Sequence, residues 1–275
     1  MNVKTRELLI KTRRRLFGQN IGNNISAFRG NGIDFAELKE YSYGDDVRKI
    51  NWKVTAREQK PYINVFNEER ELNIVLAFVL SGTVYFGSVR QKQEVMAEIL
   101  GLLSFSAIKN SDRVSTLFFD EKPQRFFKPT KSQKSVYAAL EYALETDVLG
   151  RRADMDALAS YLLNSVKERS IVLLIGDFYE SADLSFLAAK HEVYAVIVRD
   201  PFEEEPYLDG EYDLVDPVTG GHNTLQIDGD ILKRYKEMLK SRDESLYEHF
   251  AANRIAHTKI YTDEDPFIKL RELLK

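Results

Sequence analysis

The stretch that decides the fold is Leu72–Leu80, which reads LNIVLAFVL. Almost every residue in it is apolar, as expected of a strand whose two faces are both buried. Two later stretches have the same character, Ser170–Ile175 (SIVLLI) and Glu192–Val198 (EVYAVIV). Strands buried on both faces occur in parallel sheets that carry helices on each side. We therefore predict that these three stretches lie central and parallel in one sheet.

Helical and extended patterns alternate around these strands. Gln91–Asn110 repeats apolar residues at helical spacing, which predicts a helix packed against the sheet. The rest of the pattern predicts strands at Arg113–Phe119, Gln124–Phe127 and His257–Tyr261, a hairpin of Asp213–Val215 with Thr224–Ile227, and helices at Lys134–Glu145, Met155–Lys167, Leu184–Lys190, Ile231–Phe250 and Pro266–Leu274. Asp200–Asp213 holds seven acids and no bases, which is typical of a solvated loop. The alternation predicts an α/β fold with a doubly wound, mostly parallel sheet over residues 71–275.

Residues 1–70 are predicted to form an N-terminal extension to this domain. The pattern indicates a short basic helix at 5–17, a loop rich in Gly and Asn at 20–32, irregular chain at 33–59 with a short helix around Phe35–Tyr41, and a strand at Tyr62–Phe66. Residues 1–60 carry thirteen Lys/Arg and seven Asp/Glu, a net +6 in a chain of net charge −4, so the remainder sums to −10. A basic head can attract RNA, acidic lipid or an acidic partner. A solvated helix face that pairs with the acidic body explains the same charges.

The composition excludes several classes of protein. Cysteine is absent, which rules out disulfides and thiolate metal sites and is consistent with a reducing compartment. No apolar run approaches the roughly 20 residues that span a bilayer, and no apolar region follows the basic start, so we expect a cytoplasmic protein without a transmembrane segment. Phosphate-binding loops, dinucleotide-binding glycine patterns and serine-hydrolase elbows are missing, and the histidines lack zinc-site spacing. The sequence favours a binding module over an enzyme.

Two motifs carry a specific resemblance. Residues 31–57 read NGIDFAELKEYSYGDDVRKINWKVTAR, and the loop after the first buried strand contains Ser81-Gly82-Thr83. Together they resemble the bacterial domain-of-unknown-function 58 family, in which a von Willebrand factor A-like domain follows a segment of this pattern. The residues that match the segment are Phe35, Glu37, Tyr41, Gly44, Asp45, Asp46, Arg48, Ile50, Trp52, Ala56 and Arg57. Asn51 stands where the family usually has Asp, and Lys39 where it often has Arg.

The segment reads physically as a turn held by charges. Gly44 can adopt a positive φ, and Asp45 or Asp46 can accept hydrogen bonds from nearby amides. Arg48 or Arg57 is expected to pair with a carboxylate in the stretch Glu40–Asp46. Trp52, the only tryptophan, is expected to be largely buried against the main domain. On this interpretation the segment, with Tyr41, clamps the extension onto the sheet; the alternative is a partner-docking surface.

The second motif concerns metal binding. Von Willebrand factor A domains often carry a metal-ion-dependent adhesion site made of Asp-x-Ser-x-Ser, a distant Thr and a distant Asp. By that resemblance Ser81 and Thr83 match the two hydroxyl positions and Asp177 matches the distant acid, whereas Val79 and Ala153 replace the leading Asp and the Thr. Because Mg²⁺ binds oxygen ligands, these losses predict a site without metal and a protein without a cofactor.

Three interpretations of the remnant site stay open. Ser81 and Thr83 can merely cap the turn; a metal-free site of Ser81, Thr83, Asp177 and Arg152 can bind a partner; or Asp154 or Asp156 can help to rebuild a metal site. We expect an Arg, a Lys or water beside Asp177, with Arg151 or Arg152 as the candidates because they lie in the loop that would supply the Thr.

The resemblance also implies a function. Members of this family are typically associated with MoxR-type AAA+ ATPases and are thought to act as adaptors in the assembly or activation of other proteins. A non-catalytic interaction module is therefore the expected function, with a protein partner and no nucleic acid. The alternatives are a carboxylate-based hydrolase that uses Asp45, Asp46 and Asp177, and binding of acidic lipid or nucleic acid through the basic N-terminus.

Overall fold

The computed structural model describes residues 35–66 and 71–274. Contacts divide the chain between Leu72 and Asn73 into two units, and each unit is described by itself. The basic helix expected at residues 5–17 and the loop expected at 20–32 lie outside the described residues. Among the described residues, no helix combines the length and the apolar character needed to cross a membrane.

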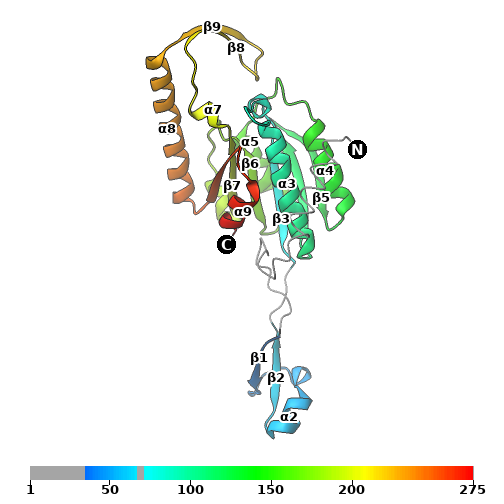
Figure 1. Cartoon of the computed structure of the whole chain (residues 1–275). Helices are drawn as coiled ribbons and strands as arrows, with labels where there is room; N and C mark the ends of the chain where they lie inside the picture. The colour runs from blue at the N-terminus through cyan, green and yellow to red at the C-terminus, as the bar shows by residue number, and fades with distance from the viewer. Residues whose placement is uncertain (1–34, 67–70, 275) are drawn as a thin grey trace. The chain divides into compact units, whose positions relative to one another are not determined.

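The larger unit is built on a six-stranded sheet in the order β10-β7-β6-β3-β4-β5 (Figure 1). Its strands are β3 (Asn73–Val79), β4 (Arg113–Phe119), β5 (Pro123–Thr130), β6 (Ile171–Gly176), β7 (Glu192–Arg199) and β10 (Ala256–Tyr261). All neighbours are parallel except β4 and β5, which pair antiparallel at one edge. The three apolar stretches are the adjacent strands β3, β6 and β7, which confirms the predicted mostly parallel sheet.

Helices cover both faces of this sheet, as the apolar strands require. Ile74, Leu76 and Phe78 alternate along β3 with Val75, Ala77 and Val79, and all six side chains are buried. The second set joins a core with α5 (Met155–Ser165), α6 (Ser185–Lys190) and Phe250. Helix α3 (Lys92–Lys109) contacts β3, β4, β6 and β7, and α4 (Gln133–Glu145) and α9 (Pro266–Leu273) pack beside it. The helix predicted at Gln91–Asn110 is thus confirmed at the sheet.

The acidic stretch Asp200–Asp213 departs from the prediction. Asp200 is fully buried, and it caps a short helix, α7 (Pro201–Glu204), through a reciprocal capping box with Glu203. A Pro at the first helical position favours this start because its missing N–H needs no partner there. The expectation of a solvated loop is therefore wrong for the first turn, where the acids serve local structure rather than solvation.

The predicted hairpin is present and longer than expected. Strands β8 (Gly210–Val215) and β9 (His222–Ile227) pair antiparallel and form a two-stranded sheet of their own. A tight turn joins them, in which the Asp216 N–H donates to the Gly221 carbonyl at 2.9 Å. The hairpin precedes the long helix α8 (Gly229–Ala252). Figure 1 shows the hairpin arching from the N-terminal end of α8 across one end of the sheet.

The smaller unit pairs two strands around a short helix. Strand β1 (Phe35–Glu40) runs antiparallel to β2 (Tyr62–Phe66), and η1 (Val47–Lys49, a 3-10 turn) and α2 (Trp52–Glu58) lie between them. The short helix predicted around Phe35–Tyr41 is wrong, because this stretch finds a partner strand more than twenty residues later along the chain. Such long-range pairing overrides local propensity.

Candidate functional site

The parallel strands end together at one edge of the larger unit, and the sequence-predicted residues of the remnant site lie there. We call this edge the carboxyl edge and define it as residues 80–91, 147–154, 177–180 and 200–207. Ser81 follows β3 and Asp177 follows β6, and these two strands are neighbours in the sheet. Ligands of open α/β sheets bind at such an edge. The fold therefore brings Ser81, Thr83 and Asp177 to one edge, as expected.

Ser81 and Thr83 are occupied with the turn that carries them. Ser81 begins a 3-10 helix, η2 (Gly82–Tyr85), and its Oγ accepts from the Thr83 N–H at 3.4 Å and from Thr83 Oγ1 at 2.8 Å. Ser81 is only 5% exposed. A side-chain oxygen that satisfies a free N–H is the ordinary role of Ser at a helix start. This geometry matches the turn-capping interpretation.

Asp177 is paired with a lysine that the sequence analysis did not identify. Lys92 Nζ lies 3.1 Å from Asp177 Oδ2 and 2.6 Å from Glu203 Oε1, and the Lys92 side chain is 0% exposed. The ammonium group thus lies among carboxylates at the carboxyl edge. The expectation that Arg151 or Arg152 fills this space is wrong: Arg151 pairs with Asp120 at 2.8 Å, and Arg152 is exposed.

Lys92 comes from the first turn of α3, which starts at the carboxyl edge because it follows β3 along the chain. A cation at a helix N-terminus is unfavourable next to the positive end of the helix dipole. Asp177 and Glu203 offset this cost and the desolvation of the ammonium group. A lysine in the first turn of an otherwise apolar helix was the signal in the sequence that could have found it.

The two replaced adhesion-site positions are packed as apolar groups. Val79 is 4% exposed, and a Cβ built on Gly176 would lie 3.0 Å from the Val79 Cβ, so the Val side chain fills the space between β3 and β6. Ala153 is 7% exposed and belongs to the core cluster on the same side of the sheet. Within the described residues no group of three or more His, Asp or Glu is placed to hold a metal ion.

A second buried cation, Arg199, shares the Tyr179 ring with Lys92. Arg199, the last residue of β7, is 0% exposed, and its guanidinium carbon lies 3.8 Å from the centroid of the Tyr179 ring. Its Nη2 pairs with Asp243 of α8 at 3.2 Å, whereas among the described residues its Nε and Nη1 have no hydrogen-bond acceptor. Burial, followed by the charge on Glu203, raises the pKa of Tyr179, so the phenol stays neutral. The cluster ties β6, β7 and α8 together through charge and stacking.

The pKa values of Asp200, which caps α7, and of Glu203, which lies within it, are shifted in opposite directions. Burial raises the pKa of Glu203, which the nearby Lys92 only partly offsets. Burial also acts on Asp200, but hydrogen bonds from Thr262 Oγ1 at 2.5 Å and from the N–H and Oγ of Ser88 hold the pKa of Asp200 below its usual value. Asp200 therefore fixes the loop after β3 to α7 and to the end of β10 as a charged group.

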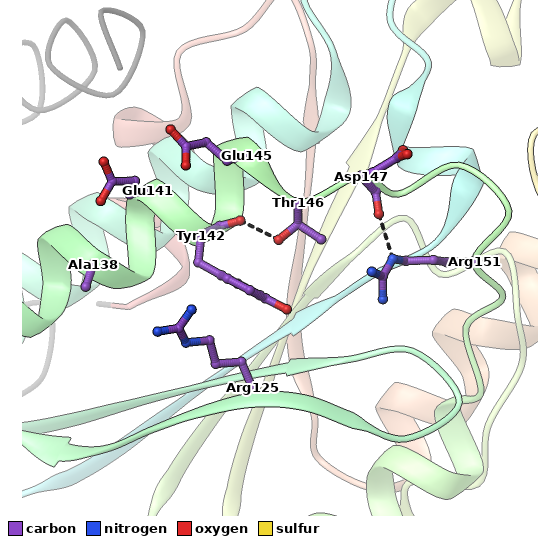
Figure 2. A pocket seen from close by; sticks show the side chains of 8 residues that line it. All are labelled: Arg125, Ala138, Glu141, Tyr142, Glu145, Thr146, Asp147 and Arg151. Atoms are coloured by element: carbon purple, nitrogen blue, oxygen red, sulfur yellow. Dashed lines mark hydrogen bonds between the residues drawn. The ribbon is translucent and has the colours of Figure 1, made fainter. Parts of the chain in front are cut away.

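A cleft opens beside the carboxyl edge, between β5, α4 and the loop 146–151 (Figure 2). Its volume is about 370 Å³, and it is lined by Arg125, Ala138, Glu141, Tyr142, Glu145, Thr146, Asp147 and Arg151. The Arg125 guanidinium lies 5.0 Å from the centroid of the Tyr142 ring, and Arg151 Nε donates to the Asp147 carbonyl at 2.6 Å. Charges of both signs line it, so the cleft has no single electrostatic preference. No motif in the sequence predicts this cleft.

The carboxyl edge also exposes apolar side chains. The segment from the end of η2 onward carries Tyr85 at 48%, Phe86 at 39% and Val89 at 69% exposure. Leu149 and Tyr207, on neighbouring loops of the edge, are 47% and 83% exposed. The rings of Phe86, Phe202 and Tyr207 follow one another with centroid distances of 6.1 and 4.9 Å. We call these five exposed residues (Tyr85, Phe86, Val89, Leu149 and Tyr207) the apolar rim.

The segment Tyr41–Arg57 of the smaller unit is held by local bonds. Gly44 has a φ of 107°, as its expected role in a turn requires. Asp45 accepts from the Ser42 N–H at 2.8 Å, and Asp46 accepts from Arg48 Nε at 3.0 Å and Nη2 at 2.9 Å. The expected pair of Arg48 with a carboxylate of the segment is present. Arg57 pairs with its neighbour Glu58 instead.

Trp52 does not have the expected environment. It begins α2 and is 71% exposed, so the expectation that it is largely buried is wrong. The reason lies in the small size of its unit: Ile63 is the only apolar side chain that is buried among residues 38–64. Tyr41, which the clamp interpretation included, is half-buried, and its N–H donates to the Pro61 carbonyl at 2.8 Å. Tyr43 and Val47 of the same unit are also exposed, at 104% and 57%.

Comparison with known proteins gives a family-level match. The sequence pattern of a family described as "Protein of unknown function DUF58" matches residues 37–245, well over half of the chain. Uncharacterized proteins of Mycobacterium bovis and Mycobacterium tuberculosis are 25% identical over 233 residues, which cover 82% of this chain and 73% of theirs. Both relatives are themselves described only as uncharacterized.

Solved structures with a similar arrangement are more distant in sequence. BatB from Bacteroides thetaiotaomicron, described as a conserved hypothetical protein, is 10% identical, with a TM-score of 0.47, and the match covers 74% of this chain and 97% of that one. An aerotolerance-related membrane protein from Bacteroides fragilis is also 10% identical, with a TM-score of 0.42, over 74% of this chain and 98% of that one.

Proposed function

The chain belongs to the DUF58 family, and from that membership we propose that it is a non-catalytic adaptor whose carboxyl edge binds a MoxR-type AAA+ ATPase. The observation that carries the proposal is the apolar rim. Its five apolar side chains are exposed on adjoining loops at the edge where α/β proteins bind their ligands. Exposed aromatic residues gathered in one place are typical of protein-binding surfaces.

The chemistry of the edge supports binding rather than catalysis. Asp177 and Glu203 are engaged by Lys92, and Asp200 is engaged by Ser88 and Thr262. A general base or a nucleophile needs a free, reachable atom. These carboxylates hold secondary-structure elements together instead. In the smaller unit Asp45 and Asp46 likewise bond to their own turn, which weakens the alternative of a carboxylate-based hydrolase.

A binding measurement with a single-site variant tests the proposal. The MoxR-type ATPase from the same genome would be purified and titrated onto the full chain in the presence of ATP and of ADP. We expect Val89→Asp to weaken binding by about tenfold or more, since it places a charge among apolar contacts at the centre of an interface. Ile268→Asp on α9, where Ile268 is 49% exposed, is the matched control. The proposal fails if the ATPase binds neither the wild type nor the control in either nucleotide state.

A further inference from the structure

The turn of the β8–β9 hairpin lies on the loops of the carboxyl edge. A Cβ built on Gly82 would be 2.1 Å from the Pro217 carbonyl oxygen, so only a glycine allows this approach. The same oxygen accepts a hydrogen bond from the Gly150 N–H at 2.9 Å. The Gly82 N–H donates to the Arg151 carbonyl at 2.9 Å, which joins the two loops beneath the turn. The tip of the hairpin is thus seated on the loop after β3 and on the loop before α5 together.

Within the described residues, few other interactions fix the hairpin to the rest of its unit. Within the described parts of the chain, β8 and β9 pair with each other and with no third strand. A lone two-stranded hairpin is marginally stable in water. Five of the six residues of β9 are exposed, the exception being Ile227 at the base. One backbone hydrogen bond at the tip adds little net stability, because water replaces it when the tip lifts.

One face of the hairpin is mostly apolar. The register sets Tyr212 opposite Leu225, Gly210 opposite Ile227 and Leu214 opposite Asn223, so four apolar side chains share this face with that of Asn223. Ile227 is buried, but Leu214 and Leu225 are 39% and 46% exposed. These exposed apolar side chains provide a surface that a bound protein can cover. The free protein leaves it partly uncovered.

We infer that the β8–β9 hairpin is a movable cover: it is seated on Gly82 and Gly150 in the free protein, and it lifts to expose the parts of these two loops that lie beneath it, next to the rim residues that are already exposed. This inference rests on the proposed function, because it concerns the regulation of the same edge. If the open form is a minor population, the apparent affinity for the partner falls in proportion to that population. Changes that release the turn therefore strengthen binding.

Amide hydrogen exchange of the free, full-length protein tests the movement without any partner. The Gly150 N–H is the reporter because its acceptor is the hairpin itself, and the β6 amides report on global unfolding. Asp216→Ala releases the turn from the hairpin side, since Asp216 accepts from the Val218 N–H at 2.8 Å and from Thr219 Oγ1 at 2.7 Å. Gly82→Ala releases it from the opposite side by steric contact with Pro217.

The exchange rates separate the outcomes. We expect the Gly150 amide to exchange faster than the β6 amides in the wild type and about tenfold faster still in both variants. The control is Gly229→Ala, because a Cβ there meets nothing within 4 Å; it should leave the Gly150 rate unchanged. If Gly150 exchanges as slowly as β6 in every variant that retains the wild-type unfolding transition, the hairpin is a fixed part of the fold and the inference is wrong.

A second measurement links the cover to binding. With the purified MoxR-type ATPase as the probe, Asp216→Ala should tighten the apparent affinity several-fold relative to Gly229→Ala. Unchanged or weaker binding to Asp216→Ala, with fast Gly150 exchange, would contradict the role as a cover. If the ATPase binds no form of the protein, the proposed function fails, while the exchange measurement still decides whether the hairpin lifts.

Discussion

Lys92 is a buried cation whose charge is balanced by two carboxylates. Its ammonium group is fully buried between Asp177 and Glu203, at distances of 3.1 and 2.6 Å. Removing one partner of a buried ion pair leaves an uncompensated charge, which costs about 3–5 kcal/mol. We expect Lys92→Met to lower the free energy of unfolding by about that amount in urea denaturation, although Met keeps most of the volume.

The control for this prediction is Lys134→Met, which changes an exposed lysine in the first turn of α4. Surface substitutions of this kind stay within about 0.5 kcal/mol. If both variants lost the same small amount, the Lys92 pairs would contribute nothing to stability, and the charged network at the carboxyl edge would need another explanation.

Metal binding provides a second prediction for single residues. We expect no binding of Mg²⁺ or Mn²⁺ to the wild type in isothermal titration, because Val79 supplies no oxygen and Lys92 already neutralises Asp177. Val79→Asp with Ala153→Thr should not create a site on its own, since the ammonium group still fills the space. The triple variant that adds Lys92→Ala should bind Mg²⁺. Tight binding to the wild type that disappears in Asp177→Ala would contradict this account.

Among the elements, α2 depends on its cap more than on its charges. Asn51 Oδ1 accepts from the Val54 N–H at 3.1 Å, and its Nδ2 donates to Asn64 Oδ1 of β2 at 2.9 Å. Loss of such a cap costs about 1 kcal/mol. We expect Asn51→Ala to increase amide exchange throughout Trp52–Glu58, whereas Asn51→Asp keeps the helix but loses the bond to β2.

Arg48→Ala is the informative comparison within the same unit. The Arg48 side chain is 87% exposed, and its partner Asp46 is 34% exposed, so solvent screens their attraction. We expect the α2 amides to exchange at the wild-type rate in this variant. A pair this exposed contributes little to the stability of the unit. Faster exchange in Arg48→Ala than in Asn51→Ala would contradict this prediction.

Local pattern predicted some elements and missed others for identifiable reasons. Continuous apolar runs predicted β3, β6 and β7, because a strand buried on both faces admits few polar residues. Strand β1 was missed because its alternation is weak and its partner lies beyond a turn and a helix. Helix α7 was hidden by its acids, although Asp200-Pro201 followed by Glu203 is a recognisable helix start.

The candidate site also contains residues that the sequence predicted and residues that it did not. The resemblance placed Ser81, Thr83 and Asp177 at one edge because parallel strands end together. It could not identify Lys92, which reaches Asp177 from 85 residues away along the chain. The resemblance also could not predict that Pro217 would lie against Gly82, because the two residues are far apart in the sequence and the turn motif does not specify what its tip contacts.

For the whole molecule, the buried acids predict how stability varies with pH. Hydrogen bonds outweigh burial and hold the pKa of Asp200 below its ordinary value of 3.8 in the folded protein. Below that value the unfolded chain binds a proton that the folded chain does not, so stability is lost as the pH falls. We expect the free energy of unfolding to decrease below about pH 4, and less steeply in Asp200→Asn.

The readout for this prediction is the slope of stability against pH between about pH 4 and pH 2.5, not the stability itself, because Asn also changes the hydrogen bonds of Ser88 and Thr262. Asp209→Asn, at an exposed position before β8, is the control and should keep the wild-type slope. An unaltered slope in Asp200→Asn would show that Asp200 carries no part of the acid sensitivity.

The position of Lys92 has a consequence in terms of mass action. A dissociable cation occupies its site only to the extent that its concentration in the surroundings exceeds its dissociation constant. A cation attached to the chain has an effective concentration fixed by the fold, so dilution and chelators cannot remove it. We therefore expect the carboxyl edge to keep the same charge at every magnesium concentration. Magnesium and chelators should then leave partner binding unchanged. Any regulation of binding would come from groups within the chain itself.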